Sequence, residues 1–166
     1  YEYLYELQQY FGFQVEEIPQ QEIEKETVSS TRIRQALSQG LIQKANAYLQ
    51  SHFPFFGVVT EINPLDNKLT KIKIKTDEIE KIVPPIGLYA GVLQMDIKKI
   101  KCLIITNEID ENIIPFIEII FQGEINITLG DNVRAFFAKE IQLYDKIDNL
   151  HKSINEYITL INELIY

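Results

Sequence analysis

The chain has 166 residues, of which 46% are hydrophobic, and its formal net charge at pH 7 is −8. This length suits one well-packed core, or a short segment followed by one domain. The excess of 24 acidic over 16 basic residues argues against a general nucleic-acid surface, because such a surface needs a basic patch.

The cysteine content and the lengths of the apolar runs indicate the cellular compartment in which we expect the protein. Cys102 is the only cysteine, so no disulfide can form within the chain, and its apolar surroundings predict a buried thiol. No apolar run approaches the roughly 20 residues that span a bilayer, and no signal peptide is visible. We therefore expect a cytoplasmic protein. Because the sequence begins at Tyr1 without a methionine, we also expect it to be part of a longer protein.

The first quarter of the chain predicts mostly helix. Apolar side chains over residues 1–10 recur at helical spacing, and residues 13–18 alternate as in a short strand. Residues 20–27 are polar and acidic, which favours a loop. Two short helices are predicted next, over residues 30–38 and 41–50. This quarter is too small for a core of its own, so we expect it to be the end of a larger domain.

From about residue 53 to 138 the pattern has period two and β-branched residues dominate. The predicted strands are 56–62, 69–75, 87–95, 100–106, 115–121, 125–129 and 133–137. Six or seven short strands joined by small turns predict a closed antiparallel barrel rather than an open sheet. In the second strand we expect the isoleucines to face the core, and Lys71, Lys73 and Lys75 to face water.

The tail, from about residue 139 to 166, contains no glycine or proline and carries apolar residues at steps of three and four. This spacing predicts a long C-terminal helix. We expect its first half to pack on the barrel. Its second half outruns a small barrel, at about 1.5 Å per residue, which leaves a homodimer through this helix as an open alternative.

A run of hydroxyl and cationic residues opens the helix predicted over residues 30–38: Ser29, Ser30, Thr31, Arg32 and Arg34. The hydroxyls can cap the free N–H groups of the first turn, and the positive helix end favours an anion. The guanidinium groups suit phosphate as a bidentate partner. The run is therefore either a phosphate clamp or an ordinary capped helix with two solvated arginines.

Four short motifs follow one another along the chain: G-F-Q-V, V-S-S-T-R-I-R, F-P-F-F-G-V-V and P-P-I-G-L-Y-A, at residues 12–15, 28–34, 53–59 and 84–90. Together they resemble the bacterial bifunctional riboflavin kinase/FMN adenylyltransferase family, also called FAD synthetase. The resemblance implies that residues 1–50 are the C-terminal remnant of an adenylyltransferase-like α/β domain. It implies that residues 51–166 form a riboflavin kinase-like, six-stranded Greek-key barrel with a C-terminal helix.

The resemblance also implies roles for particular residues. The nucleotide-binding motif S-S-T-x-I-R carries over to Ser29, Ser30, Thr31, Arg32 and Arg34, near the ATP phosphates. The H-x-G-H-type motif that completes that site is absent from this sequence, so the chain as given is not expected to make FAD.

In the kinase half, the resemblance implies that Glu118, within F-I-E-I-I, is the base that takes a proton from the riboflavin 5′-hydroxyl. Arg134 is implied to lie at the mouth of the flavin site. The alternative for Glu118 is a carboxylate on the outer face of a strand.

One departure from the family bears on catalysis. The G-F-P-T-A-N segment, which places a threonine and an asparagine on the Mg²⁺–ATP complex, is absent, and residues 63–75 occupy its place. The implied activity, ATP-dependent phosphorylation of riboflavin to FMN, is therefore expected to be weakened or lost. The alternative is a non-catalytic flavin- or nucleotide-binding or self-association module. The expected partners are riboflavin and ATP, with no nucleic acid, no membrane and no structural metal.

Overall fold

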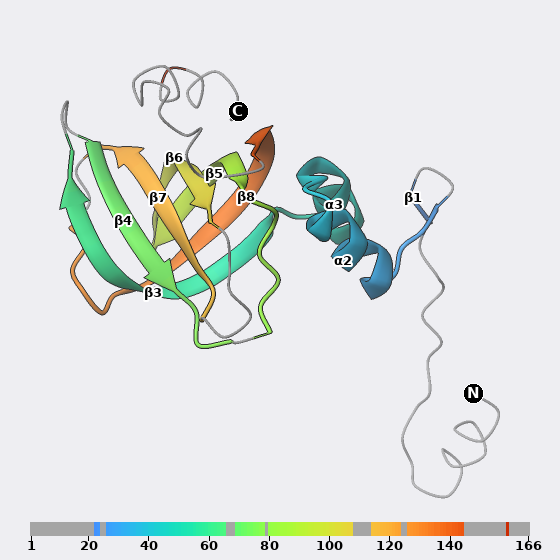
Figure 1. Ribbon diagram of the computed structural model, residues 1–166, viewed down its shortest axis with the longest axis horizontal. Coiled ribbons are helices and arrows are strands. Elements are labelled where there is room, and N and C mark those ends of the chain that lie inside the picture. The colour runs from blue at the N-terminus through green and yellow to red at the C-terminus, as the bar shows by residue number, and fades with distance from the viewer. Residues whose placement is uncertain are drawn as a thin grey trace, which may run out of the picture.

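The computed structural model describes residues 22–23, 26–65, 69–78, 80–107, 114–123, 126–144 and 159. The helix expected over residues 1–10, the strand expected over 13–18 and most of the C-terminal helix expected from about residue 139 lie outside these ranges. The described elements, shown in Figure 1, are β1 (Glu22–Ile23), β2 (Glu26–Thr27), α2 (Ser30–Ser38), α3 (Ile42–Leu49), β3 (Phe53–Pro64), β4 (Leu69–Lys75), β5 (Gly87–Met95), β6 (Lys98–Thr106), β7 (Phe116–Gln122) and β8 (Asn132–Leu143).

The six long strands close into an antiparallel barrel in the order β3-β4-β7-β6-β5-β8 (Figure 1). Strands β5, β6 and β7 follow one another as neighbours, and β4 pairs with β7 across a longer connection, which makes these four strands a Greek key. Closure pairs every strand of the barrel on both sides and so leaves no exposed sheet edge. The sequence-based expectation of a closed antiparallel barrel is confirmed, with six strands.

Three local expectations were wrong. The loop expected over residues 20–27 contains a short antiparallel pair, in which Ile23 lies opposite Glu26. Of the strand expected over residues 125–129, the described residues 126–129 form no strand. The carboxylate of Asp131 accepts hydrogen bonds from the backbone N–H of Thr128 at 2.7 Å and from its hydroxyl at 3.0 Å, which holds a turn before β8.

The third error concerns the end of β8. Residues 139–143 were expected to begin the C-terminal helix, but they extend β8, which is 12 residues long and pairs with β5 to its end. Two register shifts in this pairing, between Leu88 and Tyr89 and between Ala90 and Gly91, mark β-bulges. A bulge interrupts the alternation of inward and outward side chains, so the apolar residues there lose the period of two that identifies a strand.

The barrel interior and the helix pair share one core. Ile72, Tyr89, Cys102 and Phe137 are all fully buried inside the barrel, and the rings of Tyr89 and Phe137 meet edge to face at 5.4 Å. Buried residues of α2 and α3 belong to the same apolar cluster, namely Ala36, Leu37, Ile42 and Ala45. The helices therefore complete the barrel core rather than hold a core of their own. Burial raises the pKa of the Cys102 thiol well above its ordinary value.

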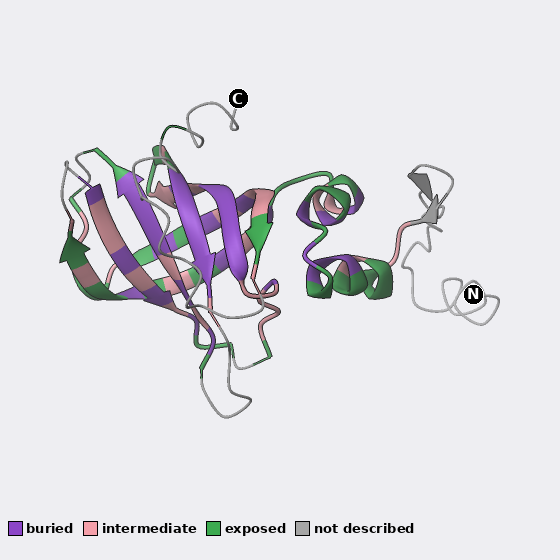
Figure 2. Ribbon diagram, turned by 45° about the horizontal axis from the view of Figure 1, so that its top comes forward, coloured by how far each residue is buried: buried purple, intermediate pink, exposed green. Residues whose placement is uncertain are grey.

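Buried and exposed residues alternate along much of the barrel, as the coloured bands of Figure 2 show. Strands β5 and β6 depart from this rule, because five consecutive residues of each are buried. Their outward side chains form a second apolar cluster with β7, made of Leu88, Ala90, Leu103, Ile105 and Ile120. In this part of the barrel, side chains on both the inner and the outer face of the sheet are buried.

The helix pair is fastened to the barrel through Asn46 of α3. Its amide nitrogen donates to the carbonyl oxygens of Phe137 at 2.8 Å and Ala138 at 3.3 Å, where β8 continues past the first residue of β3. Its amide oxygen accepts from the backbone N–H of Phe53 at 2.8 Å, at the first residue of β3. One side chain thus satisfies backbone groups on two strands where their mutual ladder ends.

Replacing Asn46 by alanine is expected to lower the free energy of unfolding by about 2 kcal/mol, because part-buried backbone groups of β3 and β8 lose their partners. Urea denaturation measures the effect. Gln43→Ala, at an exposed position of the same helix, is the matched control and is expected to change stability by less than about 0.5 kcal/mol. Equal effects of the two substitutions would contradict the assignment of Asn46 as the fastening.

Candidate functional site

Glu118 lies on the outer face of β7. Its neighbours Ile117 and Ile119 point inward and are fully buried, so the alternation of the strand directs Glu118 outward. Its carboxylate oxygen Oε1 accepts a hydrogen bond from Nζ of Lys71 on β4 at 3.0 Å, and both side chains are partly exposed. One oxygen of Glu118 is therefore engaged by a cation.

The same outer face carries a second ion pair. Lys73 of β4 donates to Oε1 of Glu61 on β3 at 3.0 Å, and its ammonium lies 4.3 Å from the centre of the Phe116 ring. The lysines of β4 face outward as the sequence predicts, while Ile72 and Ile74 are fully buried. The charged face over β3, β4 and β7 is thus a network of paired charges.

This charged face does not fit a protein-held magnesium ion. Mg²⁺ prefers oxygen ligands, usually carboxylates, and the two carboxylates described on this face, Glu61 and Glu118, are each bonded to a lysine. Within the described ranges no three His, Cys, Asp or Glu side chains group closely enough to hold a metal ion. Among the described helices, none combines the length and the apolar character that crossing a membrane requires.

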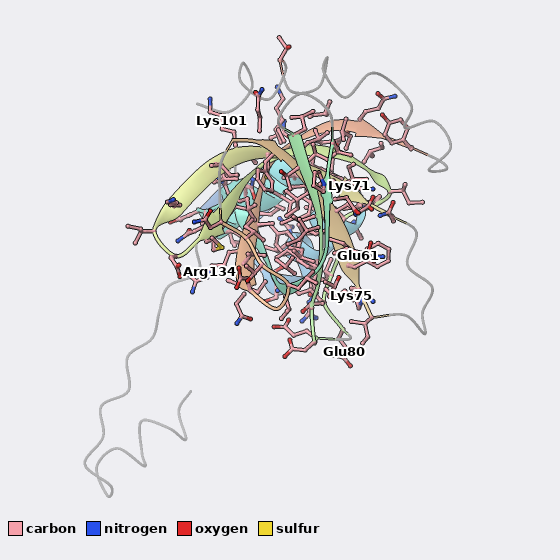
Figure 3. The ribbon with its side chains drawn as sticks, turned by 90° about the vertical axis from the view of Figure 1, so that its left-hand side faces the viewer. Glu61, Lys71, Lys75, Glu80, Lys101 and Arg134 are labelled. Carbon is pink, nitrogen blue, oxygen red and sulfur yellow. The ribbon has the colours of Figure 1, made fainter. Side chains whose placement is uncertain are left out.

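Arg134 and Glu118 lie on opposite sides of the barrel. Arg134 projects from β8, and the strand order places β7 three strands away in either direction around the ring. Figure 3 shows Arg134 on one side of the barrel and Lys71, the partner of Glu118, on the other. The resemblance implies that these two residues serve one flavin site, but the structure does not bring them together.

The hydroxyl-rich run opens helix α2 as the sequence predicts. Ser29 is the N-cap, in extended backbone conformation, and its hydroxyl oxygen accepts from the backbone N–H of Arg32 at 3.3 Å. Arg32 and Arg34 are two residues apart, which separates them by roughly 200° around the helix. The two arginines therefore point to nearly opposite sides and do not form one clamp. Arg32, but not Arg34, lines a shallow hollow of about 270 Å³ between α2 and α3.

A larger hollow lies beside Arg134 and was not predicted from the sequence. Its volume is about 360 Å³, and it is lined by Phe56, Gly57, Gln94, Asp96, Asn132, Val133 and Arg134. One feature of the sequence could have indicated this hollow. Phe55 and Phe56 are adjacent in a strand, so one of the two rings must face outward, and Phe56 is 42% exposed.

Comparison with known proteins bears on the fold. No protein-family model and no curated protein matches the chain. A solved structure of a macrolide-efflux protein from Streptococcus pneumoniae is similar, with a TM-score of 0.66 and 22% sequence identity. The match covers 96% of this chain and 50% of that one, so the present chain spans about half the length of that protein. A likeness at this level of identity establishes a shared fold.

The N-cap can be tested by substitution. Ser29→Ala is expected to lower the free energy of unfolding by about 1 kcal/mol, because the first turn of α2 loses its side-chain acceptor. Ser30→Ala, at the exposed first residue of the helix, is the control and is expected to change stability by less than about 0.5 kcal/mol. Thermal unfolding followed by circular dichroism measures both. An effect of Ser30→Ala as large as that of Ser29→Ala would refute the cap.

Proposed function

We propose that this chain is the C-terminal part of a bifunctional riboflavin kinase/FMN adenylyltransferase-like protein, and that its barrel phosphorylates riboflavin to FMN at a reduced rate or not at all. The observation that carries the proposal is the order of parts. A serine-capped helix, a second short helix and a closed six-stranded barrel follow one another as the sequence resemblance requires.

In this proposal Oε2, the second carboxylate oxygen of Glu118, accepts the proton of the riboflavin 5′-hydroxyl. The hydroxyl oxygen attacks the γ-phosphorus of ATP, and ADP leaves. Magnesium enters as the complex with ATP. Phosphoryl transfer depends mainly on positioning and on charge that stabilises the transferred group. The barrel lacks the threonine and asparagine of the family's nucleotide segment, and Lys71 occupies the other carboxylate oxygen of Glu118. Both features support a weakened activity.

The residues of the adenylyltransferase motif could form only part of an ATP site, because the H-x-G-H-type motif that completes it is absent from this sequence. Ser29 is used as a helix cap, and Arg32 and Arg34 diverge. In the proposal this segment contributes to ATP binding only together with a domain that precedes it, so the chain alone makes no FAD.

The test incubates the chain with riboflavin, ATP and Mg²⁺ and measures FMN by chromatography. Slow FMN formation that disappears in Glu118→Gln is the result expected of a weakened kinase. Glu61→Gln, which removes the other ion-paired carboxylate of the same face, is the matched control and is expected to retain the rate of the parent chain. FMN formation that persists in Glu118→Gln would contradict the role given to Glu118.

A second candidate is a non-catalytic module that binds a flavin or a nucleotide. The observation that favours it is that two strands lie between those of Glu118 and Arg134 on either side of the barrel, which leaves the two residues without a common substrate. This candidate predicts no FMN, together with a rise in riboflavin fluorescence polarisation when the chain is added. If neither FMN nor a change in polarisation appears, the kinase and the flavin-binding form of the second candidate are both wrong for this chain.

A further inference from the structure

The hollow beside Arg134 has the properties of a binding site that is separate from the charged face around Glu118. Its volume of about 360 Å³ falls at the lower end of the range of roughly 300–1,000 Å³ that small-molecule sites occupy. It lies over β3, β8 and β5, on the side of the barrel away from β7. The phosphoryl transfer proposed for Glu118 uses no residue of this hollow. Arg134, which the resemblance implies at the mouth of the flavin site, lies on β8, across the barrel from Glu118 on β7.

Strand register explains how the hollow is built. Phe56 of β3 and Gln94 of β5 are each directly opposite Arg134 of β8, so the three side chains form one row across three strands. Gly57 adds no side chain to the floor. A Cβ atom there would lie 2.6 Å from the carbonyl oxygen of Lys75, so this position is held to glycine by a close backbone approach.

The Arg134 guanidinium contacts an aromatic ring, and among the described residues its N–H groups have no hydrogen-bond acceptor. Its guanidinium carbon lies 5.6 Å from the centre of the Phe56 ring, and Nζ of Lys81 lies 5.4 Å from the same ring. Cation–π contact orients a guanidinium without supplying a lone pair. Among the described residues no oxygen accepts a hydrogen bond from Arg134, whereas Lys81 is paired with Glu78 at 3.5 Å.

Two further polar residues line the same hollow. Asp96 and Asn132 are among the residues that line it, and in the described part of the chain neither side chain is hydrogen-bonded to another side chain. Asp96 sits at a hairpin turn with a positive φ of 52°, and its carbonyl oxygen accepts from the Gln94 amide at 2.9 Å, which steadies the turn. A cation and a carboxylate thus border one hollow without pairing with each other.

The arrangement specifies the chemistry of a ligand. A guanidinium fork suits a phosphate group, an exposed aromatic ring suits a planar ring system, and a carboxylate suits a hydroxyl or amino donor. A nucleoside monophosphate carries all three groups in one molecule. We propose that the Phe56–Arg134 hollow is a binding site for a nucleoside monophosphate, with its phosphate on Arg134 and a hydroxyl or amino group on Asp96.

The experiment titrates the chain with AMP and follows binding by calorimetry and by amide chemical shifts. Saturable binding is expected, with shifts concentrated at Gln94, Asp96 and Asn132. Arg134→Met is expected to weaken binding about tenfold or more, since a charge-assisted hydrogen bond is lost. Lys71→Met removes a positive charge from the charged face around Glu118, where no residue that lines the hollow lies, and is expected to leave the dissociation constant within about twofold. Phe56→Leu, which keeps an apolar side chain and removes the ring, is expected to weaken AMP binding as well.

Comparison ligands make the proposal falsifiable. Inorganic phosphate that binds as tightly as AMP would show an adventitious ion only and would overturn the proposal. Phenylalanine binding in place of AMP would overturn it in favour of an amino-acid site. Absence of AMP binding, or binding that Arg134→Met does not weaken, would overturn it too. Glu118→Gln is expected to leave AMP binding unchanged, so this site and the proposed kinase activity can fail independently.

Discussion

The fold depends on the way Asn46 completes the end of the β3–β8 ladder. Strand β8 continues past the first residue of β3, and its carbonyl oxygens at Phe137 and Ala138 need donors there. The amide of Asn46 supplies the donors and also accepts from the first N–H of β3. The helix pair can therefore pack its buried residues into the barrel core without leaving unpaired backbone groups at the junction.

Barrel closure also decides which side chains can act together. Strands β7 and β8 are consecutive in the chain, and a simple hairpin would have placed Glu118 and Arg134 on neighbouring strands. The Greek-key order instead inserts β3 and β4 on one side, and β5 and β6 on the other, between them. The result is two separate outer surfaces: one of paired charges around Glu118, and one around Arg134 in which, among the described residues, neither the guanidinium nor the Asp96 carboxylate has an ion-pair partner.

Local patterns predicted the regular elements well. Strands β4 and β5 and helix α2 have the expected bounds. In β4 and α2 this is because clean alternation and a serine cap are encoded in adjacent residues. Residues 139–143 were misread because the bulges remove the period of two just where the strand continues. The site was predictable only in part. Residue type indicated Glu118 and Arg134 as candidates, but their separation follows from strand order, and the partnership of Lys71 with Glu118 follows from the β4–β7 pairing, which a single sequence does not encode locally.

The Asn46 junction has a consequence for the order of folding. It joins residues 91 positions apart in the sequence, and contacts of such long range form slowly because a large loop must close first. The hairpin of β5 and β6 needs no such closure and can form early. The helices precede the barrel in the chain, yet they reach their final position only once the last strand is made. During synthesis on the ribosome, α2 and α3 therefore emerge before the barrel strands but pack against the barrel only after β8 has formed.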